Sequence, residues 1–191
     1  MDEDSAEKVA AFVTLGLIDR VWSRRPFRRR RLDLCFLGAV PPYLMTGHIF
    51  RSDTGAPVNG RWFRVGVINR APSRIDNVCV QLVSVEPPHF VHAVPLPLHL
   101  MHDNPPPGEP NLRTFPVEPG GDTPTAFVDV VSKVVGQPEL QVEHTVPAVL
   151  QMYPARSYTF VLKVTAPFQK SRSRSFSVGL DDQGELTFAE S

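Results

Sequence analysis

Four histidines are the residues of this sequence whose spacing most suggests chemistry. His89, His92, His99 and His102 form two His-x-x-His pairs within 14 residues, and Asp103 follows the last of them. Neutral imidazole is the commonest metal ligand, and zinc requires three or four ligands that converge at about 2.0 Å. Residues three apart on an extended strand point to opposite faces, so each pair needs a turn to converge. A metal site is therefore one hypothesis, and surface histidines on a proline-rich segment are the other.

A run of arginines is the second feature with a chemical meaning. Its members, which form the predicted basic contact, are Arg24, Arg25, Arg28, Arg29, Arg30 and Arg31. The whole chain has 20 basic and 20 acidic side chains, so no field of one sign surrounds the molecule. The local run is typical of a solvated linker, of a strip that contacts nucleic-acid phosphates, or of a polybasic contact with anionic lipid.

The familiar catalytic signatures do not occur in the sequence. We find no Gly-x-Ser-x-Gly turn for a serine nucleophile, no phosphate-binding loop and no dinucleotide-binding fingerprint. Cys35 and Cys79 lie in strand-like runs, where they would be buried reduced thiols or would form a bridge between strands. We therefore predict a protein that is not an enzyme and needs no cofactor.

The N-terminal segment is predicted to be a helix over residues 5–22. Its body is apolar almost all round, which is typical of a helix buried on several sides. It could dock on its own domain, pack against another subunit or partner, or lie in a membrane surface with the arginines beside anionic lipid. The longest apolar run, Val9 to Ile18, is far shorter than the roughly 20 residues that span a bilayer. We expect a cytoplasmic protein, with a peripheral membrane location as the alternative.

The rest of the chain has the pattern of short strands. Apolar and polar residues alternate with period two, and turn residues separate the runs. The predicted strands are 32–37, 61–70, 77–87, 94–101, 125–133, 140–145, 157–166, 172–180 and 185–188, and a further short strand at 48–51 is an open alternative. Residues 38–60 otherwise read as a long loop, and 103–111 as a proline-rich loop. Parallel neighbours need long crossovers, so the strands should form two packed antiparallel sheets.

Two segments resemble the paired strands of bacterial immunoglobulin-like modules. They are Phe63-Arg-Val-Gly-Val-Ile-Asn69 followed by Asn77-Val-Cys-Val-Gln-Leu82, and Glu118-Pro-Gly-Gly followed by Ala126-Phe-Val-Asp-Val-Val131. The resemblance covers residues 32–189 and implies an immunoglobulin-like antiparallel β-sandwich used for binding or assembly. The predicted organisation is thus a helix and arginine-rich linker at 1–31 and a sandwich domain at 32–191. A protein partner or self-association is expected, with an anionic membrane or nucleic acid as the alternative.

Overall fold

The computed structural model describes residues 31–50, 57–88, 94–101, 113–145, 152–154 and 156–191. These residues form strands joined by turns and loops, and none of them is helical. The helix predicted at residues 5–22 lies outside these ranges. Within them, no helix has the length and apolar character that a membrane span requires.

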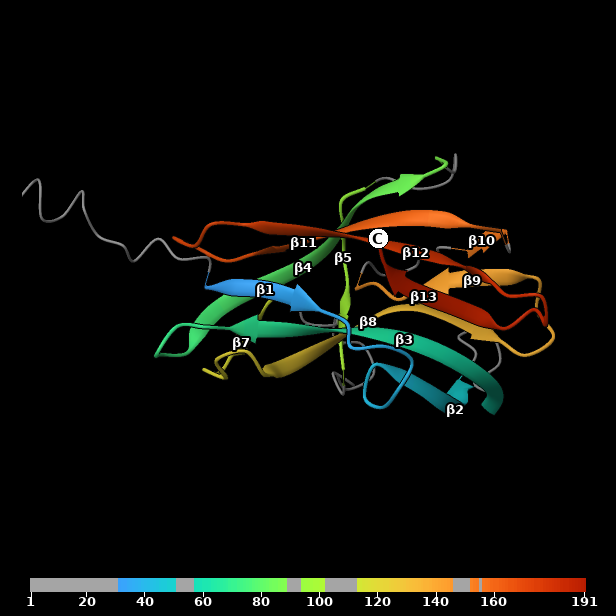
Figure 1. Ribbon diagram of the computed structural model, residues 1–191, viewed down its shortest axis with the longest axis horizontal. Helices are drawn as coiled ribbons and strands as arrows, with labels where there is room; N and C mark the ends of the chain where they lie inside the picture. The colour runs from blue at the N-terminus through green and yellow to red at the C-terminus, as the bar shows by residue number, and fades with distance from the viewer. Residues whose placement is uncertain (1–30, 51–56, 89–93, 102–112, 146–151, 155) are drawn as a thin grey trace, which may run out of the picture.

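The strands form two antiparallel sheets (Figure 1), as the alternation of side chains predicted. The seven-stranded sheet has the order β1-β3-β8-β9-β10, while β2 also pairs with β3 and β6 also pairs with β8. Its strands are β1 (Leu32–Cys35), β2 (Leu44–Phe50), β3 (Pro57–Asn69), β6 (His99–Leu100), β8 (Pro124–Val134), β9 (Glu139–Val142) and β10 (Met152–Pro154).

The six-stranded sheet has the order β13-β12-β11-β4-β5, and β7 also pairs with β4. Its strands are β4 (Ile75–Glu86), β5 (Leu96–Pro97), β7 (Phe115–Val117), β11 (Tyr158–Thr165), β12 (Arg172–Leu180) and β13 (Leu186–Glu190). The hairpin of β12 and β13 closes through the predicted turn, in which the Asp181 carboxylate accepts hydrogen bonds from the backbone N–H groups of Gln183 and Glu185.

The core lies between the sheets and follows the period-two pattern. In β11 every second residue is buried, from Tyr158 to Val164. An aromatic stack crosses from one sheet to the other: the ring of Phe188 stacks on Phe63 of β3 at 5.4 Å and on Phe176 of β12 at 4.9 Å. Such ring pairs add about 1 kcal/mol each beyond the burial of their area, so the stack helps to hold the two sheets together.

The region predicted as a long loop at 38–60 is more regular than expected. Strand β2 occupies Leu44–Phe50, and β3 already begins at Pro57. The strand pattern was not recognised in the sequence because Gly47 and the prolines interrupt it. Proline is tolerated at the first position of a strand, where it interrupts no ladder. Gly47 lies beside Trp62, and a Cβ atom at Gly47 would be 3.6 Å from the Trp62 ring.

The segment predicted as one edge strand at 94–101 instead divides between the sheets. Leu96–Pro97 pairs with β4 in the six-stranded sheet, and His99–Leu100 pairs with β8 in the seven-stranded sheet. Two further short strands, β7 and β10, were not predicted. Both contain a proline, which weakens the sequence pattern of a strand but is compatible with an edge position.

The chain enters the sandwich at a defined end. Strand β1 is antiparallel to β3, so Leu32 lies opposite Asn69 at the point where β3 finishes. The connection from β3 to β4 and the turn from β11 to β12 lie at this same end (Figure 1). We call it the arginine end and define it by Arg31, residues 70–74, residues 166–171, Arg172 and Arg174.

Candidate functional site

The buried carboxylate of Asp33 pairs with several arginines of the arginine end. The side chain of Asp33 in β1 is 7% exposed, and it forms ion pairs with Arg70, Arg172 and Arg174. Arg174 binds it in a bidentate manner, with Nε 3.1 Å from Oδ1 and Nη2 2.9 Å from Oδ2. A bidentate arginine–carboxylate pair is among the stronger polar contacts in proteins. Because Asp33 belongs to one sheet and Arg174 to the other, this cluster ties the two sheets together.

Strand register explains why these arginines reach Asp33. Arg172 and Arg174 lie directly opposite Val164 and Leu162 of β11, both of which are buried. Residues that face each other across a ladder point to the same side of the sheet, so the two arginines share the inward face of β12 with Phe176. The sequence predicted a strand at 172–180, but we did not assign its arginines to the inward face. The alternation of Phe176 and Val178, continued two and four residues toward the N-terminus, would have placed both arginines inward.

The charges of this cluster are largely balanced. Arg174 also pairs with Glu190, and Arg70 also pairs with Asp122 through a 2.6 Å contact from Nε to Oδ1. Burial by itself would raise the pKa of Asp33, but hydrogen bonds from Arg174, Arg70 and the Leu34 N–H together hold it below its ordinary value. The hydrogen bond from Arg174 to Asp33 in turn raises the pKa of the guanidinium. Asp33 is therefore ionised at neutral pH and acts as a structural counter-ion.

The connection from β3 to β4 is held by one buried amide. Asn69 is fully buried, and its Nδ2 donates hydrogen bonds to the carbonyl oxygens of Ser73 and Val117, each at 2.9 Å. Its Oδ1 accepts a 2.8 Å hydrogen bond from the N–H of Ala71. This is the asparagine at which the immunoglobulin-like resemblance ended its first strand. Its role here is structural, since it shapes the connection that carries Arg70 and Arg74.

Of the six arginines in the predicted basic contact, the structure describes one, Arg31. Arg31 lies at the start of β1, where its carbonyl oxygen accepts a 2.7 Å hydrogen bond from the N–H of Arg70. Arg24, Arg25, Arg28, Arg29 and Arg30 lie outside the described residues. The chain that carries these five arginines therefore leads directly into the arginine end.

One of the four histidines of the metal hypothesis is described. His99, in β6, lies beside Asp129 of β8, with Nδ1 3.6 Å from Oδ2. The other oxygen of Asp129 accepts a 2.5 Å hydrogen bond from Nε of Arg64, whose guanidinium lies over the Trp62 ring. His89, His92 and His102 lie outside the described residues. In the part of the chain that is described, no three His, Cys, Asp or Glu side chains are placed to hold a metal ion.

A carboxyl group with a raised pKa lies near this histidine. Burial raises the pKa of Glu143, and its Oε1 accepts a 2.5 Å hydrogen bond from the Ser132 hydroxyl. The negative charge of Asp129 also raises this pKa, whereas His99 lowers it. A carboxyl with such a shift is a feature of many catalytic sites. Here its hydrogen bond to Ser132 joins β8 to the residue after β9, within the seven-stranded sheet.

The two cysteines are unbridged and half-buried. The Cys35 sulfur lies 3.5 Å from the Tyr43 hydroxyl, and burial raises the pKa of both thiols. A raised pKa leaves little thiolate at neutral pH, so neither cysteine has the character of a catalytic nucleophile. The structure thus favours the reduced thiols over the bridge.

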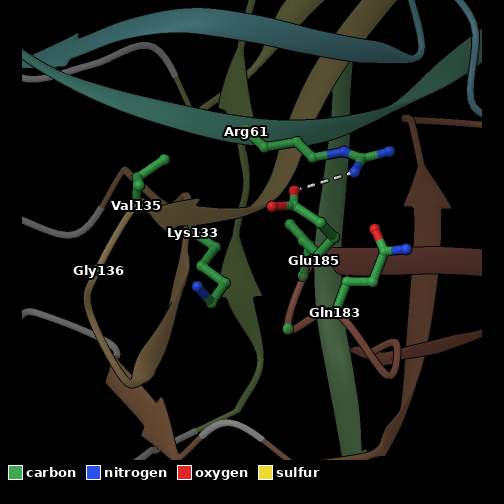
Figure 2. A pocket seen from close by; sticks show the side chains of 8 residues that line it. Arg61, Lys133, Val135, Gly136, Gln183 and Glu185 are labelled. Carbon is green, nitrogen blue, oxygen red and sulfur yellow. Dashed lines mark hydrogen bonds and ion pairs between the residues drawn. The ribbon is translucent and has the colours of Figure 1, made fainter.

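A pocket of about 220 Å³ lies at the opposite end of the sandwich (Figure 2). Its lining combines the start of β3, the β8–β9 turn and the β12–β13 turn, and includes Arg61, Lys133 and Glu185. The Glu185 carboxylate lies between the two cations in Figure 2 and accepts a 3.2 Å hydrogen bond from Arg61. Since this carboxylate already neutralises Arg61, the pocket is poorly suited to an anion.

Comparison with known protein families, curated proteins and solved structures gives no match for this chain. The functional assignment therefore depends on the geometry described above.

Proposed function

We propose that this protein is a non-enzymatic binding module with an immunoglobulin-like sandwich, and that it contacts an anionic partner through the arginine end. In this proposal the sandwich is a rigid scaffold. The arginine-rich segment and the turns of the arginine end are the contact surface. The predicted metal site is not part of the proposal.

The strand order supports the immunoglobulin-like arrangement. In that fold, strands A, B and E share one sheet with D, and strands C, F and G form the other. Here β1, β3 and β8 are neighbours in one sheet, and β4, β11 and β12 are neighbours in the other. Taken in chain order, these six strands correspond to A, B, C, E, F and G. The β3–β4 and β11–β12 connections then correspond to the B–C and F–G loops, which bind antigen in antibody variable domains.

A tyrosine contact supports the same assignment. Tyr158 is the first residue of β11, and its hydroxyl donates a 3.1 Å hydrogen bond to the carbonyl oxygen of Pro154, four residues earlier. A tyrosine near the start of strand F that bonds to the backbone a few residues upstream is a hallmark of immunoglobulin domains. The hydroxyl also accepts a 3.0 Å hydrogen bond from Nε of Arg156.

One observation carries the proposed contact surface: the arginine-rich segment joins the sandwich at the end formed by those two connections. Residues 20–32 contain seven arginines and no acidic residue. Arg31 is hydrogen-bonded to the beginning of the β3–β4 connection. The arginines that the sandwich itself brings to this cluster, Arg70, Arg172 and Arg174, are neutralised by Asp33, Asp122 and Glu190, so the excess positive charge at this end comes from the segment that precedes β1.

Retention on an immobilised polyanion tests the proposal. We expect replacement of Arg28, Arg29 and Arg30 by glutamine to lower the salt concentration at which the protein elutes from heparin, because fewer counterions are released on binding. The matched control replaces three basic residues elsewhere, Arg113, Lys133 and Lys163, and removes the same charge. Equal elution shifts for the two triple variants would reject the arginine end as the contact surface.

Self-association through the N-terminal segment is the alternative binding function. The apolar run from Val9 to Ile18 favours burial against some surface. Deletion of residues 1–24, followed by measurement of the mass in solution, separates the two. A fall from oligomer to monomer would show that the segment drives assembly, whereas a monomer before and after would leave the anionic contact as its role.

A further inference from the structure

Phe168 is an exposed aromatic residue that the sandwich does not use. It lies in the β11–β12 turn with a relative exposure of 106% and a φ of +59°. A bulky residue in this left-handed region is uncommon, because its Cβ approaches the backbone. Fold stability would favour glycine or asparagine at this position. The ring therefore incurs both backbone strain and exposure to water without a contact that compensates for them.

Phe168 lies near an exposed lysine and near the entry point of the arginine-rich segment. Lys170 is exposed two residues later, and no ion pair is found for it within the described part of the chain. Arg172 begins β12 and reaches Asp33 at 3.5 Å. Because Asp33 lies next to Leu32 at the start of β1, the turn and the entry point of the arginine-rich segment lie close together (Figure 1). An aromatic tip beside cations is the pattern of a side chain that enters the headgroup region of an anionic bilayer.

The sequence beside this surface favours lipid over nucleic acid. The apolar run Val9 to Ile18 lies a few residues before the arginines. An apolar segment adds binding free energy at a bilayer interface, in proportion to the area it buries. A nucleic acid offers no comparable apolar phase, since its affinity for proteins comes mainly from phosphates and stacking.

We infer that the anionic partner is the surface of an anionic phospholipid bilayer, that Phe168 inserts at its headgroup–acyl boundary, and that Lys170 and the arginines at 24–31 contact lipid phosphates. This inference rests on the proposed function, because it names the partner of the same surface. It adds a residue that the arginine-rich segment alone does not imply. The Phe168 turn joins β11 and β12, which are paired over seven residues, so it orients the sandwich on the membrane.

The test uses the full chain and co-sedimentation with vesicles of phosphatidylcholine, with or without phosphatidylserine. We expect binding to the phosphatidylserine vesicles alone, and weaker binding as salt increases. Phe168→Asn removes the ring but suits the left-handed backbone, so it should fold at least as well as the wild type. Because this variant loses the apolar area that the ring would bury in the bilayer, it should bind about tenfold or more weakly.

The matched control is Val135→Asn. Val135 is 69% exposed in the turn at the opposite end of the sandwich, and its replacement should leave vesicle binding unchanged. A second measurement reports insertion directly: the emission added by Phe168→Trp should be quenched by brominated acyl chains, whereas that added by Val135→Trp should not.

Two outcomes distinguish this inference from the proposed function. Binding to single-stranded DNA but not to vesicles, lost when Arg28, Arg29 and Arg30 become glutamine, would overturn the lipid inference and support the anionic contact. Vesicle binding that Phe168→Asn leaves unchanged would overturn the role of the turn. If neither vesicles, DNA nor heparin bind, both proposals are wrong.

Discussion

At the scale of single residues, the inward charges of β12 are the most informative feature of this protein. A strand that buries Phe176 and Val178 also points Arg172 and Arg174 toward the interior. They are accommodated because Asp33 stands opposite them at the edge of the other sheet. A buried charge is tolerated only when it is paired and hydrogen-bonded, and Asp33 meets both conditions for Arg174.

The first prediction concerns the pH dependence of this cluster. The pKa of Asp33 is lowered in the folded protein, so its stabilising effect is present above the ordinary aspartate pKa of about 3.9 and is lost as pH falls through the lower folded value. Asp33→Asn should therefore reduce the free energy of unfolding at neutral pH by about 1.5–3 kcal/mol, since it weakens hydrogen bonds to a charged group. The difference from the wild type should shrink below about pH 4, as urea unfolding at several pH values would show.

Asp122→Asn provides the control for this measurement. Asp122 also pairs with Arg70, but its side chain is 86% exposed, so its loss should change stability by less than about 1 kcal/mol. A difference between wild type and Asp33→Asn that stays constant from neutral to acid pH would contradict the role of Asp33 as an ionised partner.

The second prediction concerns the tyrosine at the start of β11. Tyr158→Phe removes only the hydroxyl, which contacts Pro154 and Arg156. The free energy of unfolding should fall by about 1 kcal/mol, because the partly buried hydrogen bond to the Pro154 carbonyl is lost. Tyr43→Phe is the comparison: its hydroxyl has a longer, weaker 3.5 Å contact with sulfur, so its loss should be smaller. The reverse order of the two losses would argue against a tyrosine corner.

At the scale of elements, the connections at the arginine end depend on local hydrogen bonds. Strand β3 belongs to one sheet and β4 to the other, so the chain between them must turn sharply while its backbone groups remain paired. Asn69 satisfies three of these groups and therefore sets the position of the residues that follow it. Gly120 contributes nearby, because a Cβ there would lie 2.3 Å from the Thr123 carbonyl oxygen.

The third prediction tests this connection. Asn69→Ala leaves two carbonyl oxygens and one N–H of the connection without their side-chain partner, so we expect a loss of about 3 kcal/mol in the free energy of unfolding. Asn77→Gly is the control, since Asn77 is exposed and has a φ of +55° that glycine adopts without strain. Its replacement should be neutral or slightly stabilising in thermal unfolding. Similar losses for both variants would show that Asn69 has no special role.

At the scale of the whole molecule, the two ends of the sandwich differ in character. The arginine end receives the arginine-rich segment and presents Phe168, whereas the opposite end has a pocket in which Glu185 neutralises Arg61. The chain as a whole has no net charge. The binding to an anionic surface that we propose would therefore be oriented, because one end and the segment before it would provide the attraction.

The fourth prediction tests the division at residue 31. Deletion of residues 1–24 should leave the thermal unfolding midpoint of the sandwich within a few degrees of the wild type, because β1 begins at Leu32 and the core lies beyond it. The same deletion should weaken vesicle binding strongly, since it removes the apolar run. A large fall in the midpoint would show that the N-terminal segment is part of the folded domain.

The strands and their burial could be predicted from the sequence because both depend on local pattern. Alternation in Tyr158–Thr165 and Arg172–Leu180 identifies the strands and their apolar faces without reference to any other part of the chain. Short strands that contain proline, such as Phe115–Val117, were missed because tertiary pairing holds them where the local pattern is weak.

The candidate site, in contrast, could be recognised only in the tertiary structure. The sequence by itself determined that short antiparallel strands form two sheets and that arginines precede the first strand. It could not show that Asp33 meets Arg174, 141 residues away, or that Phe168 and Arg31 lie at the same end. Those contacts depend on which strands become neighbours and in which register. That choice is made by the packing of the two sheets as a whole, to which each local segment contributes only its apolar face.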